Sequence, residues 1–223
     1  MNIERPSLAR RAAHHAALAD VARLAVVDAL AAGDLSPSEI QVRLGLPSNL
    51  VAHHLKVLQD VGIVARRRSE GDRRRTYLTL TDHSALGPYP VEPTPVDRVV
   101  FVCSANSARS QLAAALWAAN SDVPVASAGT RPAEQVAAGA RAAADRHGLT
   151  LAAAGPQRLA DVAADGDLLV AVCDNAYEEL GSAVAIHWSI ADPVPQGDEA
   201  AFDLAHAELD RRIGVLAPRL AAS

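Results

Sequence analysis

The residues best suited to chemistry lie in one short stretch, Cys103–Ser110, which reads Cys-Ser-Ala-Asn-Ser-Ala-Arg-Ser. An apolar run, Val99–Val102, leads into Cys103, and Ser107–Ala119 has apolar residues at helical spacing. A tight loop between a strand and a helix directs backbone N–H groups at one point, which makes an anion site. Those amides and the Arg109 guanidinium favour a thiolate at Cys103, and the guanidinium also matches a tetrahedral oxyanion. The stretch therefore predicts a nucleophile and an oxyanion-binding loop in one place.

Each further residue of the stretch has an expected part in this loop. The predicted oxyanion loop consists of Ser104, Ala105, Asn106, Ser107, Ala108 and Ser110. Asn106 is expected to hold an unusual backbone, because asparagine tolerates the left-handed conformation. Ser107 is a candidate helix cap, and the Ser110 hydroxyl either hydrogen-bonds the thiolate or serves only as a cap.

A leaving oxygen needs a proton, so a carboxylic acid is expected to face the loop. Asp192 is the candidate for this general acid, because Asp192-Pro193 follows a predicted strand late in the chain. The competing interpretation is an ordinary Asp-Pro turn. We therefore predict Cys103, Arg109 and Asp192 as the catalytic set.

The stretch Cys103–Ser110 resembles the phosphate loop of the low-molecular-weight protein tyrosine phosphatase superfamily, which includes one class of arsenate reductases. Further matching segments follow in order: Ser127–Thr130, Val172–Asn175 and His187–Pro193. The resemblance covers about Val96–Leu220. It departs from the family pattern at Ala105 and Ala108, where the family often carries Gly and Cys.

The residues after Asp192-Pro193 bear on the substrate that this resemblance implies. The phosphatases commonly carry aromatic residues there, which grip a phosphotyrosine ring, whereas this chain has Val194 and Pro195. The segment His187–Pro193 looks more like the arsenate reductase branch. The resemblance therefore implies arsenate as substrate, with phosphate esters as the alternative.

The reductant is a second open question. In one subgroup of arsenate reductases a cysteine at the position of Cys173 resolves the adduct, and a third cysteine lies seven residues later, where this chain has Leu180. Either Cys103 and Cys173 form a pair that a thioredoxin system reduces, or an external thiol of the mycothiol or glutathione type attacks the adduct. We favour the external thiol and expect no tightly bound cofactor and no metal site. Cys173 is equally well interpreted as a buried strand cysteine.

The first part of the chain carries a different signature. Ser36–Glu39 reads as a capping box that opens a short helix ending at Gly45, and Ser48–Asp60 reads as a second helix. Strands over Ile63–Arg68 and Arg73–Leu80 then flank the turn Ser69–Asp72 and predict a β-hairpin. A helix-turn-helix followed by an arginine-tipped hairpin predicts binding to double-stranded DNA.

The second of these helices has two distinct faces. A buried stripe is expected from Val51, Leu55 and Leu58, while a small polar face with Ala52 is left for the major groove. Arginines beside the hairpin turn are suited to phosphates or a minor groove. The predicted DNA-binding residues are Ser48, Asn49, His53, Lys56, Arg66, Arg67, Arg68, Arg73, Arg74 and Arg75.

The segment Leu18–Thr81 resembles the ArsR-type winged helix repressors, through Ala19–Leu24, His53–Leu58 and the hairpin. Family members are homodimers, and many sense metals or metalloids through cysteines. This segment has no cysteine, which excludes a thiolate arsenite site in it. A linker replaces the family's usual last helix, so dimerisation is expected to fall on the N-terminal helices.

Composition and patterning predict two domains. Residues 1–90 hold 12 Lys and Arg against 9 Asp and Glu, whereas residues 91–223 hold 9 against 17, so a basic part precedes an acidic one. We predict a winged helix-turn-helix domain over residues 1–81, a proline-rich linker over 82–97 and a phosphatase-like domain over 98–223. The first domain is expected to be mostly α with a β-hairpin wing.

Apolar strands alternate with helices in the last domain, which predicts an α/β fold with a four-stranded parallel sheet and helices on both faces. Strands are expected at Val99–Val102, Val123–Ser127, Leu168–Cys173 and Ala183–His187, with helices at Ala133–His147, Gln157–Ala163 and Glu199–Leu216. The chain shows no apolar run of membrane-spanning length, and its start lacks the apolar segment of a signal peptide. A cytoplasmic protein without a membrane partner is therefore expected.

Three hypotheses remain open from the sequence. The first is an arsenate reductase fused to a DNA-binding domain. The second is a phosphatase acting on phosphotyrosine or small phosphoesters. The third is a transcriptional regulator whose second domain senses an oxyanion with negligible turnover.

Overall fold

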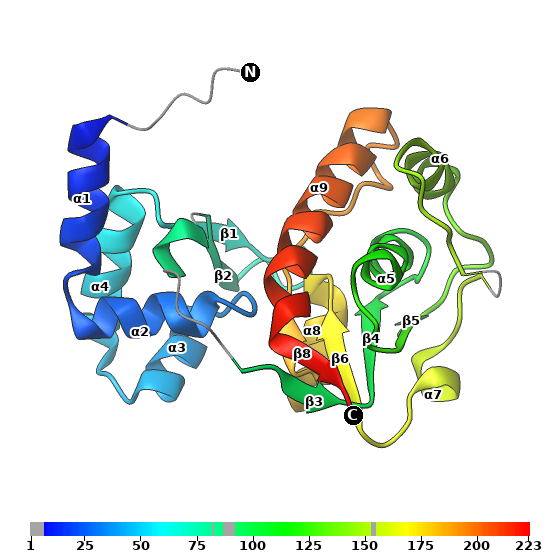
Figure 1. Cartoon of the computed structure of the whole chain (residues 1–223), viewed down its shortest axis with the longest axis horizontal. Helices are drawn as coiled ribbons and strands as arrows, with labels where there is room; N and C mark the ends of the chain where they lie inside the picture. Colours follow the sequence, from blue (N-terminus) through cyan, green and yellow to red (C-terminus); the bar gives the residue numbers. More distant parts are fainter. Residues whose placement is uncertain (1–6, 82, 87–91, 153–154) are drawn as a thin grey trace. The chain divides into compact units, whose positions relative to one another are not determined.

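The structure is a computed structural model that describes residues 7–81, 83–86, 92–152 and 155–223. The chain divides into two compact units, one made of Met1–Ser69 and Arg74–Pro90, the other of Glu70–Arg73 and Val91–Ser223. The predicted fold class is confirmed, because the first unit is helical with an antiparallel hairpin and the second is α/β with a four-stranded parallel sheet (Figure 1).

The first unit contains the predicted helix-turn-helix and its hairpin. Its elements are α1 (Leu8–Leu18), α2 (Val21–Leu30), α3 (Pro37–Leu44), α4 (Ser48–Asp60), β1 (Val64–Arg68) and β2 (Thr76–Leu80). Strands β1 and β2 pair antiparallel, with Arg66 opposite Leu78 and Arg68 opposite Thr76. The hairpin strands are shorter than the predicted Ile63–Arg68 and Arg73–Leu80.

Local signals explain where helix α3 begins and ends. The Ser36 hydroxyl accepts a hydrogen bond from the Glu39 amide at 3.2 Å, and the Glu39 carboxylate accepts one from the Ser36 amide at 2.6 Å. Gly45 ends the helix in the left-handed conformation, with φ of 65°. The predicted capping box is confirmed, and the following turn leads directly into α4.

The core of the first unit forms where the stripe of α4 meets the other elements. Val51, Leu55 and Leu58 are buried, as the helical spacing predicts, and they cluster with Ile40 of α3 and Leu78 of β2. This packing leaves the opposite face of α4 exposed.

The second unit is organised on one parallel sheet. Its strands are β4 (Arg98–Cys103), β5 (Val125–Gly129), β6 (Asp167–Ala171) and β7 (Ile186–His187), in the order β5-β4-β6-β7. Val102 lies opposite Ala128 on one side and Ala171 on the other. The chain thus moves to opposite sides of β4, and such a switch point is where parallel sheets place their ligands, at the carboxyl ends of the strands.

Helices cover this sheet. They are α5 (Arg109–Asn120), α6 (Ala138–Arg146), α7 (Leu159–Val162), α8 (Asp174–Leu180) and α9 (Glu199–Leu216). Helices α5, α6 and α9 pack on one another, whereas α8 contacts β4 and β6 (Figure 1). Helix α9 buries one apolar stripe, Phe202, Ala205, Leu209, Ile213 and Leu216. The aromatic centre of the core is Phe101, whose ring contacts those of Trp117 and Trp188.

Several predicted boundaries are wrong. Helix α5 begins at Arg109 rather than Ser107, and α6 begins at Ala138 rather than Ala133. The strand predicted at Val123–Ser127 is observed at Val125–Gly129. The strand predicted at Leu168–Cys173 is observed at Asp167–Ala171, and the one predicted at Ala183–His187 is observed at Ile186–His187. Predicted helix Gln157–Ala163 is the single turn Leu159–Val162. These differences leave the order of elements unchanged.

One small pair of parallel strands was not predicted from the sequence, β3 (Thr94–Val96) with β8 (Leu220–Ala222). Strand β3 and the 3-10 turn His83–Leu86 lie within the predicted linker, while Gly87, Pro88 and Pro90 lie outside the described residues. The other 3-10 turns are Gly181–Ala183 and Ala217–Arg219. Among the described residues, no helix is both long and apolar enough to cross a bilayer.

Candidate active site

The loop after β4 is shaped by hydrogen bonds to its carbonyl groups. The carbonyls of Cys103, Ser104, Ala105 and Ser107 accept hydrogen bonds of 2.8–3.2 Å from the backbone N–H groups of Thr130, Arg131, Ala133 and Ala137. In a planar trans peptide the C=O and the N–H of the same peptide group point in opposite directions. Because these carbonyls point toward the segment 130–137, the N–H groups of the same peptides point to the other side of the loop. The loop thus has the geometry of an anion-binding nest.

Cys103 ends β4 at the base of this loop and is buried. Its sulfur lies 3.1 Å from the Ser110 hydroxyl and accepts a hydrogen bond from the Asn106 amide at 3.2 Å. The structure therefore brings Ser110 to the sulfur, whereas Ser107 does not cap α5, whose N-cap position is Ala108 without a side-chain bond.

Asn106 fixes the backbone of the loop. It is fully buried, and its φ of 50° is the only positive φ outside glycine among the described residues. Its side chain donates to Ser110 Oγ at 2.8 Å and accepts from Gln111 Nε2 at 3.2 Å and from the Gln157 amide at 2.8 Å. Sequence reasoning missed Gln111, whose only signal is a polar residue on the buried face of α5.

Gly129 lets the loop pass close to the neighbouring strand. A Cβ at this position would lie 2.7 Å from the Ser104 carbonyl oxygen and 3.1 Å from the Asn106 amide nitrogen. Both are backbone atoms, so they cannot move away cheaply. The glycine in the segment Ser127–Thr130 is therefore explained by the close packing of β5 against the loop.

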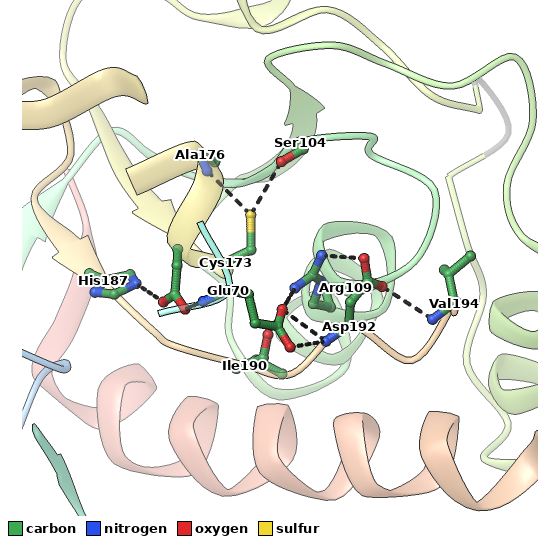
Figure 2. A network of polar contacts seen from close by, with 10 residues as sticks. Glu70, Ser104, Arg109, Cys173, Ala176, His187, Ile190, Asp192 and Val194 are labelled. Atoms are coloured by element: carbon green, nitrogen blue, oxygen red, sulfur yellow. Dashed lines mark hydrogen bonds and ion pairs between the residues drawn. The ribbon is translucent and has the colours of Figure 1, made fainter. Parts of the chain in front are cut away.

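Arg109, the first residue of α5, places its guanidinium at the edge of the loop. Nη1 donates to the Ile190 carbonyl at 2.8 Å, and Nη2 lies 2.9 Å from Asp192 Oδ2 (Figure 2). Burial acts to lower the pKa of Arg109, but negative charge at Cys173, Asp192, Cys103 and Glu70 outweighs it and raises that pKa. The guanidinium is therefore a fixed, buried positive charge that both cysteines and the carboxylates face.

Asp192 reaches the site from the segment after β7. Besides its ion pair with Arg109, its Oδ1 accepts a hydrogen bond from the Val194 amide at 3.1 Å (Figure 2). The side chain is partly exposed, and Val194 beside it is also exposed. The structure thus brings the three predicted catalytic residues, Cys103, Arg109 and Asp192, to one place.

Cys173 lies at the same edge of the sheet, because it follows β6 by two residues and β6 is the neighbour of β4. Its sulfur is 3.7 Å from Ser104 Oγ and accepts from the Ala176 amide at 3.4 Å (Figure 2). Both cysteines are free thiols and buried. Burial raises the pKa of Cys173, although Arg109 acts in the opposite direction.

A buried polar pair supports the start of α8. His187 Nε2 lies 2.9 Å from Asp174 Oδ1, and the His187 ring stacks on Tyr177 at 4.1 Å. Burial acts to raise the pKa of Asp174, but hydrogen bonds from His187, the Glu70 amide and Ser189 outweigh it and lower that pKa. The sequence marked His187 and Asp174 only as parts of motifs.

Sequence reasoning also missed Glu70. The turn segment Glu70–Arg73 packs as part of the second unit, where the Glu70 amide donates to Asp174 at 2.8 Å and the Asp72 amide donates to Glu178 at 2.7 Å. The Glu70 carboxylate lies 3.3 Å from Arg109 Nη1 and accepts from the Asp192 amide at 3.1 and 3.2 Å (Figure 2). No sequence signal connected this turn with the loop.

The predicted DNA-binding residues, all in the first unit except Arg73, lie on two exposed surfaces. Ser48, Asn49, His53 and Lys56 are exposed on α4, where Lys56 pairs with Asp60 at 2.9 Å. The six arginines Arg66–Arg68 and Arg73–Arg75 are exposed on the hairpin. In the part of the chain that is described, no group of three or more His, Cys, Asp or Glu is placed to hold a metal ion.

Two family models match the chain. The family described as low molecular weight phosphotyrosine protein phosphatase matches residues 98–223, and a helix-turn-helix domain matches residues 18–67. Both agree with the resemblances found in the sequence. A curated relative, an uncharacterized HTH-type transcriptional regulator of Bacillus subtilis named YdgJ, is 41% identical over 51 residues, which are 23% of this chain and 31% of that regulator's length.

Solved structures that match part of this chain include a tyrosine phosphatase and an arsenate reductase. Vibrio vulnificus Wzb in complex with benzylphosphonate has a TM-score of 0.50 at 20% identity, covering 56% of this chain and 99% of that one. The tyrosine phosphatase AmsI of Erwinia amylovora has 0.49 at 24%, covering 56% and 94%. An arsenate reductase of Archaeoglobus fulgidus has 0.44 at 28%, covering 52% and 94%. The first likeness agrees with the α/β fold of the second unit.

Proposed function

Because the chain belongs to the low molecular weight phosphotyrosine protein phosphatase family, we propose that its second unit is a thiol-dependent arsenate reductase with Cys103 as nucleophile. The observation that carries this is the position of the Cys103 sulfur, which receives hydrogen bonds at the base of a loop whose amides and Arg109 suit a tetrahedral oxyanion. The lack of an aromatic wall at Val194 and Pro195 favours a small inorganic oxyanion over a phosphotyrosine ring.

The reaction begins when the Cys103 thiolate attacks arsenic and forms a sulfur–arsenic bond. The hydroxyl oxygen of arsenate takes a proton from the protonated form of Asp192, the arsenic–oxygen bond breaks and water leaves, so that Asp192 becomes the carboxylate that pairs with Arg109. A second thiolate then attacks the Cys103 sulfur, so a disulfide forms and the sulfur–arsenic bond breaks with its electron pair on arsenic. Arsenite leaves as As(III), the two sulfurs are oxidised, and another thiol reduces the disulfide.

We assign the second thiol to an external low-molecular-weight reductant of the mycothiol or glutathione type. Burial raises the pKa of Cys173, which reduces its thiolate fraction at neutral pH. The residue seven positions later is Leu180, so no third cysteine completes an internal relay. The alternative is a Cys103–Cys173 disulfide reduced by a thioredoxin system, which the nearness of Cys173 to Ser104 supports. In both cases no tightly bound cofactor takes part.

The second candidate is hydrolysis of phosphotyrosine or small phosphoesters. The ion pair of Asp192 with Arg109 favours it, because it puts a carboxyl group beside the anion site. Hydrolysis needs no thiol reductant, whereas arsenate reduction consumes two thiols for each arsenite. This difference separates the two reactions in one assay.

For the first unit we propose binding to double-stranded DNA and regulation of transcription. Helix α4 would enter the major groove with Asn49, His53 and Lys56, and the hairpin arginines would hold phosphates. A homodimer in the cytoplasm is part of this proposal. Replacing Arg73–Arg75 with alanines should weaken binding across sequences and lower the salt dependence, measured by fluorescence anisotropy at several salt concentrations.

The test of the enzymatic proposal combines two substrates and three reductants. The full chain is incubated with arsenate and a mycothiol, glutathione or thioredoxin system, and arsenite is measured; an aryl phosphate is assayed beside it. We expect arsenite with a low-molecular-weight thiol, none from Cys103→Ser, and activity retained in Cys173→Ser. Loss of activity in Cys173→Ser would assign the resolving role to Cys173.

Other outcomes contradict the proposal itself. Aryl phosphate hydrolysis without arsenite would establish the phosphatase. The absence of both products, together with operator binding that arsenate or phosphate shifts, would establish an oxyanion sensor.

A further inference from the structure

The carboxylate of Glu70 occupies hydrogen-bonding groups of the candidate active site. It lies 3.3 Å from Arg109 Nη1 and accepts hydrogen bonds from the Asp192 amide, while the Glu70 amide is held by Asp174 (Figure 2). Neither the proposed nucleophilic step nor the proton transfer uses this residue. Its position therefore needs another explanation.

The charges in the site indicate that Glu70 and a bound oxyanion compete for Arg109. The Arg109 guanidinium is almost fully buried, and it already faces the carboxylates of Asp192 and Glu70. Arsenate and phosphate are anions at neutral pH and would bind beside Glu70, which repels them at short range. A bound oxyanion and the Glu70 carboxylate also require the same guanidinium, since Nη1 is the atom that Glu70 contacts.

The turn that carries Glu70 is held by more than this one ion pair. The Asp72 amide donates to Glu178, and a Cβ on Gly71 would lie 2.5 Å from the same carboxylate, so the turn sits closely against α8. The Glu70 side chain itself is 41% exposed. The Glu70 side chain can therefore move away from Arg109 while the backbone of its turn stays in place.

We propose that Glu70 is an internal anion that competes with the substrate oxyanion for Arg109, so that the turn Glu70–Arg73 lowers the affinity of the site. This rests on the proposed function to the extent that the Cys103 loop binds a tetrahedral oxyanion. It goes beyond that function by assigning a regulatory residue outside residues 98–223. An anion that binds tightly displaces the Glu70 carboxylate, whereas a weak one does not.

The experiment measures binding of inorganic phosphate to the full chain by isothermal titration calorimetry, so no turnover is needed. Glu70→Gln keeps the size of the side chain and one acceptor oxygen but removes its charge, and Glu70→Ala removes the charge together with the hydrogen-bonding groups. Glu92→Gln is the matched control, because it removes the same charge at another exposed position of the second unit. Thermal melts of each variant establish that the fold is kept.

We expect the phosphate Kd to fall about tenfold in Glu70→Gln and Glu70→Ala and to stay within twofold of wild type in Glu92→Gln, with a smaller gain at high salt. An unchanged or weaker affinity in both Glu70 variants would overturn the inference, since Glu70 would then merely position Arg109. Absence of phosphate binding in every variant would overturn both this inference and the anion site. Tighter binding without any arsenite formation would keep the inference and remove only the proposed reductase activity.

Discussion

Replacing Asn106 by alanine tests whether this one side chain holds the oxyanion loop. The change removes three hydrogen bonds, to Ser110, Gln111 and the Gln157 amide, all in a buried region. At about 1 kcal/mol net for each bond, their loss destabilises the second unit by about 3 kcal/mol. Alanine at a φ of 50° adds about 1 kcal/mol of backbone strain, so the expected total is about 4 kcal/mol.

Asn106→Gly separates the two contributions. Glycine loses the same hydrogen bonds but adopts a positive φ without strain, so it should be about 1 kcal/mol more stable than the alanine variant. Asn120→Ala is the control, because Asn120 is exposed near the end of α5 and its side chain donates one hydrogen bond, to the Leu116 carbonyl. That control should cost less than about 1 kcal/mol.

Urea unfolding followed by tryptophan fluorescence measures these differences in the second unit alone. The chain has two tryptophans, Trp117 and Trp188, and both are buried in that unit. With an m-value of about 2 kcal/mol/M, the expected midpoint falls by about 2 M for Asn106→Ala. Equal midpoints for wild type and both Asn106 variants would refute the reasoning, and so would a glycine variant less stable than the alanine variant.

Two further changes probe the packing and the charge of the site. Gly129→Ala should lower stability by about 1–3 kcal/mol and weaken phosphate binding at least about tenfold, because its Cβ would meet the Ser104 carbonyl oxygen. The control is Gly214→Ala on α9, where a Cβ would meet nothing within 4 Å, and its effect on stability should be neutral or slightly favourable. Urea midpoints and calorimetry measure both, and equal behaviour of the two variants would contradict the close approach. The pKa of Asp174 is lowered in the folded state from its ordinary value of 3.8, so its contribution to stability is present above that value and is lost as pH falls through the lowered pKa. The stability difference between wild type and Asp174→Asn, measured in urea from about pH 6 to pH 3, should therefore shrink at the acid end; a constant difference would contradict the hydrogen bonds assigned to this carboxylate.

Local patterns were sufficient to predict much of the fold. The capping box at Ser36, the stripe on Ser48–Asp60 and the long helix Glu199–Leu216 depend on neighbours within a few residues, and the structure shows all three. The apolar run before Cys103 predicted the central strand, because a parallel strand is buried on both faces. The order of strands then placed Cys103 and Asp192 toward the same edge of the sheet.

Features that depend on contacts between residues far apart in the chain could not be predicted from the sequence. Strands β3 and β8 pair residues at opposite ends of the second unit, and their short, weakly apolar sequences carry no strand signal. Glu70 contacts a residue 39 positions away in the chain, and its surroundings of serine, glycine and aspartate read only as a turn. Such contacts follow from packing of whole elements rather than from periodicity.

The wrong start predicted for the helix Ala133–His147 has a physical cause that bears on function. Ala133, Glu134 and Gln135 are good helix formers, yet the helix begins only at Ala138. The amides of Ala133 and Ala137 instead donate to the carbonyls of Ala105 and Ser107. Local propensity is thus overridden by hydrogen bonds that hold the loop carbonyls outward and turn its amides toward an anion. Because such conflicts between local preference and structure concentrate at functional sites, this segment is itself an argument that the loop after β4 binds an oxyanion.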